Sequence, residues 1–229
     1  MIARILLDTA PLPGGGDLKL FQRGEEYSIT LGGNELMNSR KSGSEEALAA
    51  LGCAGLRARP KARVLIGGLG MGFTLRAALA ELARDAETVV AELVPAVIAW
   101  AHGPMAHLYG GSPDDRRVRI VEGDVAGLIA GAAATWDAIL LDVDNGPDGL
   151  TVQSNDALYA PAGLAAARAA LRPGGVLAIW SAAPDAAFTG RLRRAGFAVQ
   201  EHRARAARGK GGHHVIWTAR APGAGARRG

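Results

Sequence analysis

Residues 63–83, RVLIGGLGMGFTLRAALAELA, decide the fold. RVLI has the aliphatic composition of a buried strand, GGLGMG is mostly glycine, and FTLRAALAELA is rich in helix-forming Ala and Leu. Glycines at this position let backbone N–H groups at a helix N-terminus approach a ligand without a Cβ in the way. The stretch therefore predicts a strand, a ligand-binding turn at 67–72 and a helix.

The rest of the chain after residue 62 repeats this alternation of strand and helix. Apolar β-rich runs alternate with Ala- and Leu-rich segments: TVVAEL, PAVIAWAHG, VRIVEGD, VAGLIAGAA, WDAILLDVD, APAGLAAARAALRPGG, VLAIWSA and DAAFTGRLRRAG. Strands without a polar face, separated by helices, are typical of a parallel sheet covered on both sides. FAVQEHR and HHVIWTA follow the last helix and are expected to form an antiparallel hairpin at a sheet edge. We predict a doubly wound, Rossmann-like α/β domain over 62–222.

The first 61 residues have a different pattern. Short β-forming runs between glycine turns, ARILLDTA, DLKLFQRG, EEYSITLGG and NELMNS, predict a small N-terminal β unit. A helix is expected to start at Ser44, with Glu45 and Glu46 in its first turn. We expect this unit to form a lid or the contact of a homodimer. Residues 223–229 are Gly, Ala and Arg and predict a flexible basic tail.

The amino-acid composition argues against several classes of protein. Of 229 residues 48% are hydrophobic and 21% charged, enough to bury a core, and the apolar start is interrupted too early for a signal peptide or a membrane span. We expect a cytoplasmic protein. Cys53 is the only cysteine and the five histidines form no HExxH pattern, so no metal site is expected. The net charge is +4, and the basic C-terminal region lacks interleaved aromatic residues, so nucleic acid is not the favoured partner.

The spacing of the glycines excludes two common cofactor motifs. Gly68, Gly70 and Gly72 form G-x-G-x-G, whereas the dinucleotide motif G-x-G-x-x-G would need glycine where Phe73 or Leu75 stands. This argues against NAD and FAD, and the lysine of a phosphate-binding P-loop is also absent.

Three acidic residues follow consecutive predicted strands. Glu92 ends TVVAEL about 20 residues beyond the glycines, where a carboxylate can accept both hydroxyls of a ribose. Asp124 follows VRIV, and Asp142 follows AILL. The carboxyl ends of parallel strands open onto the crevice where such sheets bind ligands, so these acids predict the site. Asp144 and Asn145 extend it, although Asp-Asn-Gly-Pro is also a turn sequence.

The sequence resembles the spermidine synthase-like branch of the class I S-adenosylmethionine-dependent methyltransferase superfamily over nearly its whole length. The resemblance rests on GGLGMG, Glu92, Gly123-Asp124, LDVDNGP at 141–147, Leu158-Tyr159 and LRPGGVLAIWS at 171–181. It implies that the glycine loop faces the methionine part of the cofactor, Glu92 its ribose and Asp124 its adenine. In this resemblance Asp142 matches the acid that begins the aminopropyltransferase D-x-x-D-P stretch, whereas the second acid of that stretch is displaced. We expect Asp142 and Asp144 to be catalytic, and Asn145 and Tyr159 to bind the acceptor.

Departures from the aminopropyltransferase pattern decide which group we expect to move. Leu69 and Met71 stand where an acid would hold the amine of decarboxylated S-adenosylmethionine, and Ser44-Glu45-Glu46-Ala47 replaces a Tyr-His-Glu motif. We therefore expect an enzyme that transfers a methyl group from S-adenosylmethionine to a small-molecule acceptor. Two alternatives stay open, namely an aminopropyltransferase using the decarboxylated cofactor, and a non-catalytic cofactor- or nucleic-acid-binding protein.

Overall fold

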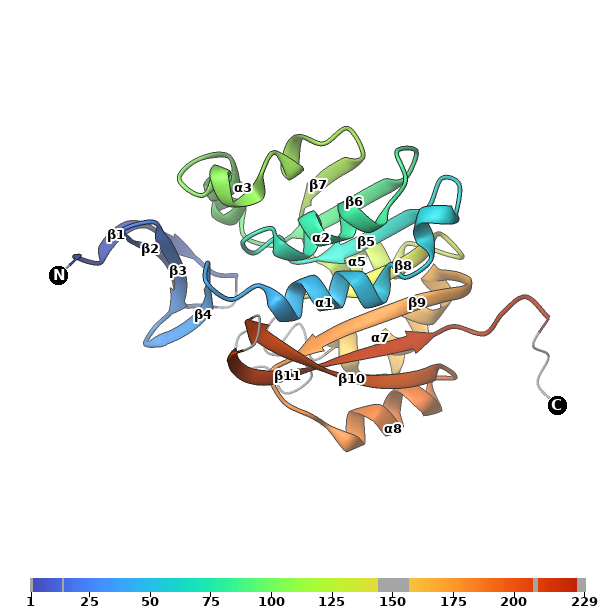
Figure 1. Ribbon diagram of the computed structural model, residues 1–229. Coiled ribbons are helices and arrows are strands. Elements are labelled where there is room, and N and C mark those ends of the chain that lie inside the picture. The colour runs from blue at the N-terminus through green and yellow to red at the C-terminus, as the bar shows by residue number, and fades with distance from the viewer. Residues whose placement is uncertain (1, 14, 144–156, 208–209, 226–229) are drawn as a thin grey trace.

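The computed structural model describes residues 2–13, 15–143, 157–207 and 210–225 (Figure 1). The N-terminal β unit is a four-stranded antiparallel sheet in the order β1-β2-β3-β4. Its strands are β1 (Ile5–Pro11), β2 (Asp17–Arg23), β3 (Glu26–Leu31) and β4 (Asn34–Asn38). Its inner face, with Leu18, Leu20 and Ile29, joins a core shared with the larger domain.

The larger domain is built on a seven-stranded sheet in the order β10-β11-β9-β8-β5-β6-β7. Its strands are β5 (Arg63–Gly67), β6 (Glu87–Glu92), β7 (Val118–Glu122), β8 (Trp136–Leu141), β9 (Leu171–Ser181), β10 (Ala198–Ala207) and β11 (Lys210–Arg220). The pairs β7·β6, β6·β5, β5·β8 and β8·β9 are parallel, whereas β11 pairs antiparallel with both β9 and β10. The predicted doubly wound α/β domain with a C-terminal edge hairpin is confirmed.

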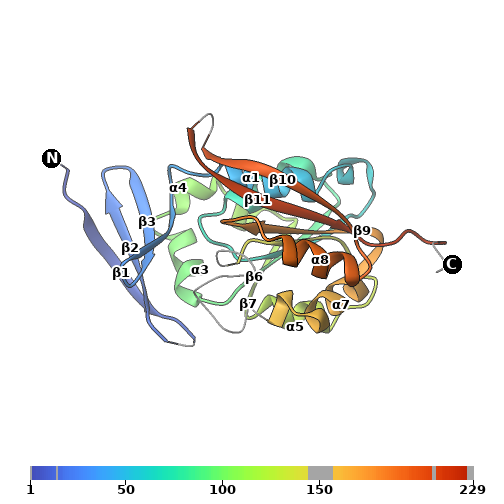
Figure 2. The same cartoon turned by 90° about the horizontal axis from the view of Figure 1, so that it is seen from below.

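Helices cover both faces of this sheet (Figure 2). The helices of the described residues are α1 (Gly43–Gly52), α2 (Phe73–Glu81), α3 (Pro95–His102), α4 (Ala106–Tyr109), α5 (Val125–Ala130), α7 (Pro161–Ala170) and α8 (Ala186–Arg194), with short turns η1 (Leu56–Ala58) and η2 (Ser112–Asp114). α1, α2 and α3 share one core with the N-terminal sheet, and α5, α7 and α8 share the other. Because a hydrophobic core lies on each side of the sheet, neither face of its central strands is polar.

Strand β5 shows this two-sided burial residue by residue. Val64 and Ile66 belong to the core under α1 and α2, whereas Leu65 points to the core under α5 and α7, and all three are 0% exposed. Because side chains alternate across a strand, burial on both faces favours apolar residues at consecutive positions. The run VLI at 64–66 therefore indicates a central strand.

The start of α1 differs from the prediction. The helix begins at Gly43 with Ser42 as its N-cap residue, so the predicted start at Ser44 is wrong. Ser42 makes no capping bond to the backbone; its hydroxyl donates to Glu46 Oε1 at 2.9 Å. Ser44 is therefore inside the first turn, 0% exposed, and its side chain is used elsewhere. α1 packs against α2, β9 and β10, and the division of the chain at residue 61 stays a prediction.

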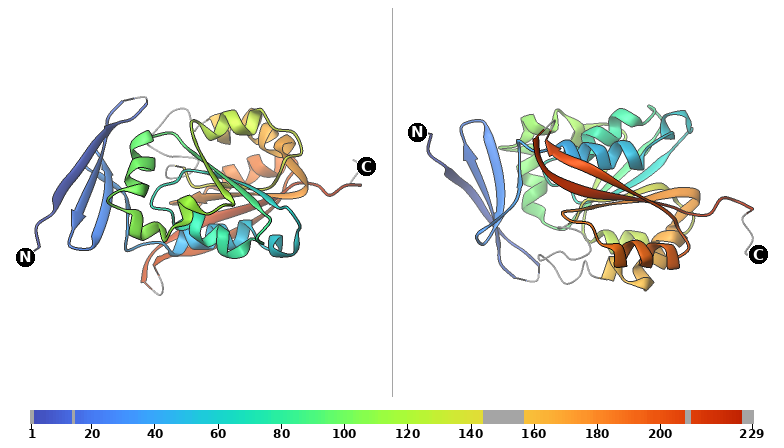
Figure 3. Two further views of the ribbon diagram at one scale, coloured as in Figure 1. Left: turned by 90° about the horizontal axis from the view of Figure 1, so that it is seen from above. Right: turned by 60° about the horizontal axis from the view of Figure 1, so that its bottom comes forward.

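The N-terminal sheet forms a separate layer beside the larger domain (Figure 3). Trp100 of α3 donates its indole N–H to Asp8 Oδ2 at 2.7 Å, and the rings of Tyr27 and His107 lie 5.3 Å apart. The edge strand β1 leaves Ile5 and Leu6 57% and 49% exposed. A homodimer through this unit stays a prediction, which light scattering of the purified chain would test.

Neither a membrane-spanning helix nor a metal-binding cluster is found among the described residues. None of the helices there is long and apolar enough to cross a membrane. No cluster of three or more His, Cys, Asp or Glu side chains is arranged in that part of the chain to hold a metal ion.

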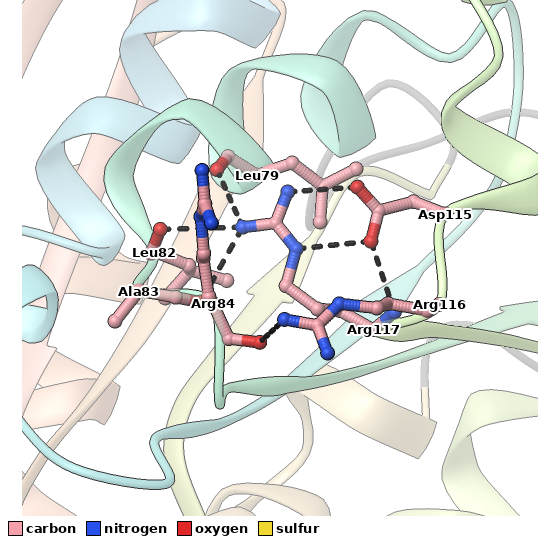
Figure 4. Close-up of polar contacts among 7 residues, drawn as sticks. All are labelled: Leu79, Leu82, Ala83, Arg84, Asp115, Arg116 and Arg117. Atoms are coloured by element: carbon pink, nitrogen blue, oxygen red, sulfur yellow. Dashed lines mark hydrogen bonds and ion pairs between the residues drawn. The ribbon is translucent and has the colours of Figure 1, made fainter.

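An arginine ties the end of α2 to the start of β7 (Figure 4). Arg117 Nη1 donates to the carbonyls of Leu79, Leu82 and Ala83 at 3.1, 3.2 and 3.4 Å. Asp115 holds the same guanidinium through Nε and Nη2 at 2.9 and 2.8 Å. The last carbonyls of a helix have no partner within the helix, so Arg117 supplies what the helix itself cannot.

Arg117→Ala is therefore expected to lower the free energy of unfolding by about 2 kcal/mol. The hydrogen bonds from Arg117 lower the pKa of Asp115 from its ordinary 3.8 to about 2. A lowered carboxyl pKa adds stability that is present above the ordinary pKa and is lost as the pH falls through the lowered one. In urea unfolding, the difference between wild type and variant should shrink between about pH 4 and pH 2. Arg119→Ala, on the exposed side of β7, is the matched control and should have little effect at any pH.

Candidate active site

A cavity of about 380 Å³ lies at the carboxyl ends of β5, β6 and β8, between the larger sheet and β4. Its volume is in the range of small-molecule sites. Five carboxylates line it: Glu35, Glu45, Glu92, Asp124 and Asp142. Among the described lining residues, the basic side chains are Lys41 and His214. The cavity is therefore acidic, in a chain whose overall charge is positive.

The glycine loop forms the floor of the cavity. Gly68 has a φ of +89°, and a Cβ there would lie 2.5 Å from the carbonyl oxygen of Asp142, so only glycine fits between the two strand ends. Gly68, Leu69, Gly70 and Met71 line the cavity. Gly72, with a φ of +78°, instead packs under Tyr109, whose ring a Cβ would strike at 2.2 Å. Of the three glycines, Gly68 and Gly70 contact the cavity and Gly72 shapes the turn.

Glu92 ends β6 and fixes the glycine loop as well as facing the cavity. Its Oε2 accepts from the Leu69 N–H and its Oε1 from the Val94 N–H, both at 2.9 Å. The residue is 7% exposed, and burial raises the pKa of its carboxyl group while these backbone N–H groups oppose the rise. Each carboxylate oxygen has a second lone pair, so both can still accept a ligand hydroxyl.

Asp124 follows β7 and caps α5. Its Oδ1 accepts from the Ala126 N–H at 2.8 Å, which is the usual contact of an N-cap acid. It lines the cavity beside Gly123 and Val125. The prediction that Glu92, Asp124 and Asp142 lie at one edge of the sheet agrees with this geometry; their roles toward a cofactor stay a prediction.

Asp142 lies at the end of β8 next to a second acid that the sequence analysis did not select. Thr74 donates to Asp142 Oδ2 at 2.5 Å. Burial, and then the neighbouring charge of Glu45, raise the pKa of Asp142 to about 7, and the bond from Thr74 works against the rise. Burial also raises the pKa of Glu45. The two acids form a pair that readily binds a cation or takes up a proton.

Ser44 and His214 complete the polar wall behind this acidic pair. Ser44 donates to Glu45 Oε2 at 2.6 Å, and His214 Nδ1 lies 2.9 Å from Ser44 Oγ. The His214 ring packs edge-on against Trp180, with centroids 4.7 Å apart. Burial and the charge of Lys41 lower the pKa of His214, which favours the neutral imidazole. These residues come from α1, β9 and β11, far from the glycine loop in sequence.

Strand β4 supplies a further wall that the sequence analysis missed. The pairing of β3 with β4 shifts register between Ile29 and Thr30, and four consecutive β4 residues, 35–38, line the cavity. Such irregularities re-aim side chains next to binding sites. Asn38 donates from Nδ2 to Glu35 Oε1 at 2.6 Å and so orients this carboxylate. The sequence of β4, NELMN, contains no motif that indicates a ligand site, so the sequence analysis did not select it.

The remaining predicted site residues have different positions. Asp144 and Asn145 lie outside the described residues. Tyr159 is 3% exposed and is not among the described lining residues; its ring packs against Phe188 with centroids 5.6 Å apart. Its hydroxyl donates to the carbonyl of Val143 at 3.5 Å. Tyr159 therefore supports the strand end next to Asp142 from the core, and any contact with an acceptor stays a prediction.

A seven-stranded sheet with an antiparallel edge hairpin, a glycine turn after β5 and acids after β6, β7 and β8 defines a Rossmann-like nucleotide-binding fold. Within that class, the fold is similar to that of spermidine synthases, in agreement with the sequence resemblance.

Solved structures support this assignment of the fold. A spermidine synthase in complex with the transition state analogue AdoDATO has a TM-score of 0.72 at 19% identity, covering 94% of this chain and 72% of that chain. The spermidine synthase from Thermotoga maritima gives 0.74 with the same identity and coverage. A probable spermidine synthase from Corynebacterium glutamicum ATCC 13032 gives 0.66 at 15% identity, over 96% of this chain and 81% of that chain.

Curated relatives are similar over a shorter stretch. The chain is 32% identical over 145 residues to polyamine aminopropyltransferases of Mycobacterium tuberculosis, strains CDC 1551 and H37Rv, and of Mycobacterium bovis. This stretch is 59% of this chain and 27% of the length of those relatives. No protein-family profile matches the sequence.

These comparisons contradict the predicted methyl transfer. The similar proteins bear the names of aminopropyltransferases and spermidine synthases, which agree with the alternative reading. The prediction relied on Leu69 and Met71 in place of an acid in the glycine loop. Both side chains do line the cavity, but Glu35 and Glu45 bring carboxylates to it from β4 and α1.

Proposed function

We propose that the chain is an aminopropyltransferase that moves the aminopropyl group of decarboxylated S-adenosylmethionine to a small amine. The observation that carries the proposal is the acid-lined cavity, with five carboxylates against Lys41 and His214 among its described residues. Both reactants are cations, and a buried site that collects cations must supply opposite charge.

The same charge favours the decarboxylated donor over S-adenosylmethionine itself. The two donors differ by one carboxylate, which would enter a cavity already lined by carboxylates. Like charges brought together in a partly buried site cost several kcal/mol, and this repulsion supports discrimination without an acid in the glycine loop. Glu35, oriented by Asn38, is one of the carboxylates available for the donor's amine.

The donor's nucleoside fits the glycine-loop side of the cavity. Gly68 and Gly70 leave room for its close approach, Glu92 offers both oxygens to the ribose, and Asp124 lies at the next strand end. The acceptor amine fits the other side, between the Glu45–Asp142 pair and the indole of Trp180. A carboxylate pair and an aromatic face are the usual surroundings of an organic ammonium group.

The donor's sulfonium makes its aminopropyl carbon electrophilic, so the protein's residues position and deprotonate the acceptor. Asp142 takes a proton from the acceptor's ammonium group, which frees the nitrogen lone pair. The nitrogen then forms a C–N bond as the C–S bond breaks, and the electron pair of that bond stays on sulfur in the neutral thioether product. The cavity aligns the two groups and excludes water, which is the larger part of the protein's contribution.

Purified chain should be incubated with decarboxylated S-adenosylmethionine and putrescine, and with other diamines, and methylthioadenosine and the new polyamine quantified. Equal amounts of the two products are expected, with no methylated amine from S-adenosylmethionine. If none of the diamines gives a polyamine, the proposed function is wrong. Asp185→Asn, at the N-cap of α8 and outside the lining residues, is the control for substitution of the cavity residue Asp142 and should still make both products.

Glu92→Ala tests the donor site by itself. The variant is expected to weaken binding of methylthioadenosine by about 1.5–3 kcal/mol, because charge-assisted hydrogen bonds to the ribose are lost. Loss of the bonds to Leu69 and Val94 could also disturb the loop, so Glu92→Gln, which keeps its size, should be measured beside it. Calorimetry gives the affinities. Unchanged affinity in both variants would remove Glu92 from the ribose site.

A further inference from the structure

The acidic pair of the cavity is connected to a histidine through one hydroxyl group. Ser44 Oγ contacts Glu45 Oε2 at 2.6 Å and His214 Nδ1 at 2.9 Å, so it bridges a carboxylate and an imidazole. Ser44 is 0% exposed, whereas Glu45 and His214, at the two ends of this chain of contacts, are both half-buried. The His214 ring lies near Lys41, an exposed residue, so this end of the chain of contacts leads toward the molecular surface.

We propose that Ser44 and His214 form a proton path that carries the acceptor's proton from the Glu45–Asp142 pair to solvent. This inference rests on the proposed function, because the proton in question is the one removed from the acceptor amine. With donor and acceptor seated, the cavity is filled, and the protein's own groups have to carry the proton out. A hydroxyl can do so because it donates and accepts hydrogen bonds at once.

The proton balance fixes the direction of each hydrogen bond. Asp142 receives the proton and shares it with Glu45. Protonated Glu45 donates to Ser44 Oγ, and the Ser44 hydroxyl gives its own proton to His214 Nδ1. The imidazolium then releases a proton from Nε2 to water. The path requires the tautomer of His214 whose Nδ1 is bare, and protonated Glu45 selects that tautomer because Ser44 then donates toward the ring.

The surroundings of His214 suit a relay. Lys41 is the positive group near the ring, and it favours prompt release of the proton. From β9 the ring meets the indole of Trp180, and on β10 the residue opposite His214 is the uncharged Ala204. On the α1 side the acid is Glu45, reached through Ser44. A neutral imidazole at rest can accept a proton, which a permanent cation could not do.

The first test needs no turnover. By ¹⁵N NMR of the imidazoles, His214 in the wild type should change from the Nε2–H to the Nδ1–H tautomer as the pH rises through about 7, the value to which the pKa of the paired Asp142 is raised, because ionised Glu45 accepts the Ser44 proton. Ser44→Ala should abolish this change. Identical tautomer populations in wild type and variant at every pH would overturn the path.

The second test measures kcat and KM over the same pH range. His214→Gln and Ser44→Ala are expected to lower kcat about 10- to 100-fold with KM within about two-fold. Added imidazole should restore much of the kcat of His214→Ala. His202→Gln is the matched control, because His202 on β10 also contacts a hydroxyl, Thr218 Oγ1 at 2.9 Å, but lies outside the cavity lining. A kcat of His214→Gln equal to that of the wild type would overturn the proposed path. If the wild type itself shows no turnover, the proposed function is wrong, and the NMR test alone decides whether the path exists.

Discussion

Asp142→Asn is expected to lower turnover by about 10²- to 10⁴-fold while the protein stays folded. Asparagine keeps the size of the side chain and can still accept the hydrogen bond from Thr74, but it cannot take a proton. Because the pKa of Asp142 is raised to about 7, wild-type kcat should rise with pH up to about that value as the base form appears. In Asp142→Asn this rise of kcat with pH should be absent.

The same substitution is expected to stabilise the protein above neutral pH. A raised carboxyl pKa means that the folded state holds a proton that the unfolded state releases, so stability falls as the pH rises from about 3.8 to about 7. Asp142→Asn removes that loss, and its free energy of unfolding at about pH 8 should exceed that of wild type by about 1–2 kcal/mol. Stabilisation with lost turnover would mark a functional acid. A variant that unfolds would show Asp142 to be a structural residue, and full turnover would remove it from the mechanism.

The sequence was sufficient for the fold because local pattern and burial agree. The runs VLI at 64–66 and AILL at 138–141 are apolar throughout, and in the structure their residues alternate between two cores. The carboxyl ends of these strands could then be located, and Glu92 and Asp142 were found at the cavity by that route. Periodicity and strand order are short-range properties, which is why this part of the analysis succeeded.

The walls of the cavity could not be predicted in this way, because they are formed by residues that are far apart in the sequence. Ser44 and His214 are 170 positions apart and meet through the antiparallel return of β11, which no local pattern encodes. The wrong prediction of methyl transfer has the same origin. We expected the acid for the donor's amine within the glycine loop, whereas Glu35 and Glu45 enter from elements that precede the loop in sequence. Tyr159 was assigned to the site from its position in a motif, but its ring is packed in the core.

The amino end of β8, opposite the cavity, depends on a single buried acid that no sequence pattern revealed. Asp137 is 1% exposed and lies one residue after the start of the strand. Its Oδ2 accepts from the Arg63 backbone N–H at 2.8 Å and from Arg172 Nη1 at 2.7 Å, and its Oδ1 lies 2.8 Å from Arg59 Nε. One carboxylate thus joins β8, β5, β9 and the turn before β5.

Asp137→Ala is expected to lower the free energy of unfolding by about 3–5 kcal/mol, because Arg59, Arg172 and a backbone N–H lose their common partner at once. Glu87→Ala is the matched control. Glu87 on β6 also binds an arginine, Arg63, at 2.9 Å, but its side chain is 46% exposed, so its loss should cost less than about 1 kcal/mol. Urea unfolding of the three proteins at neutral pH measures both differences. If both substitutions lower the free energy of unfolding equally, the burial of Asp137 contributes nothing to stability. This follows because the two lost carboxylates differ chiefly in their exposure to water.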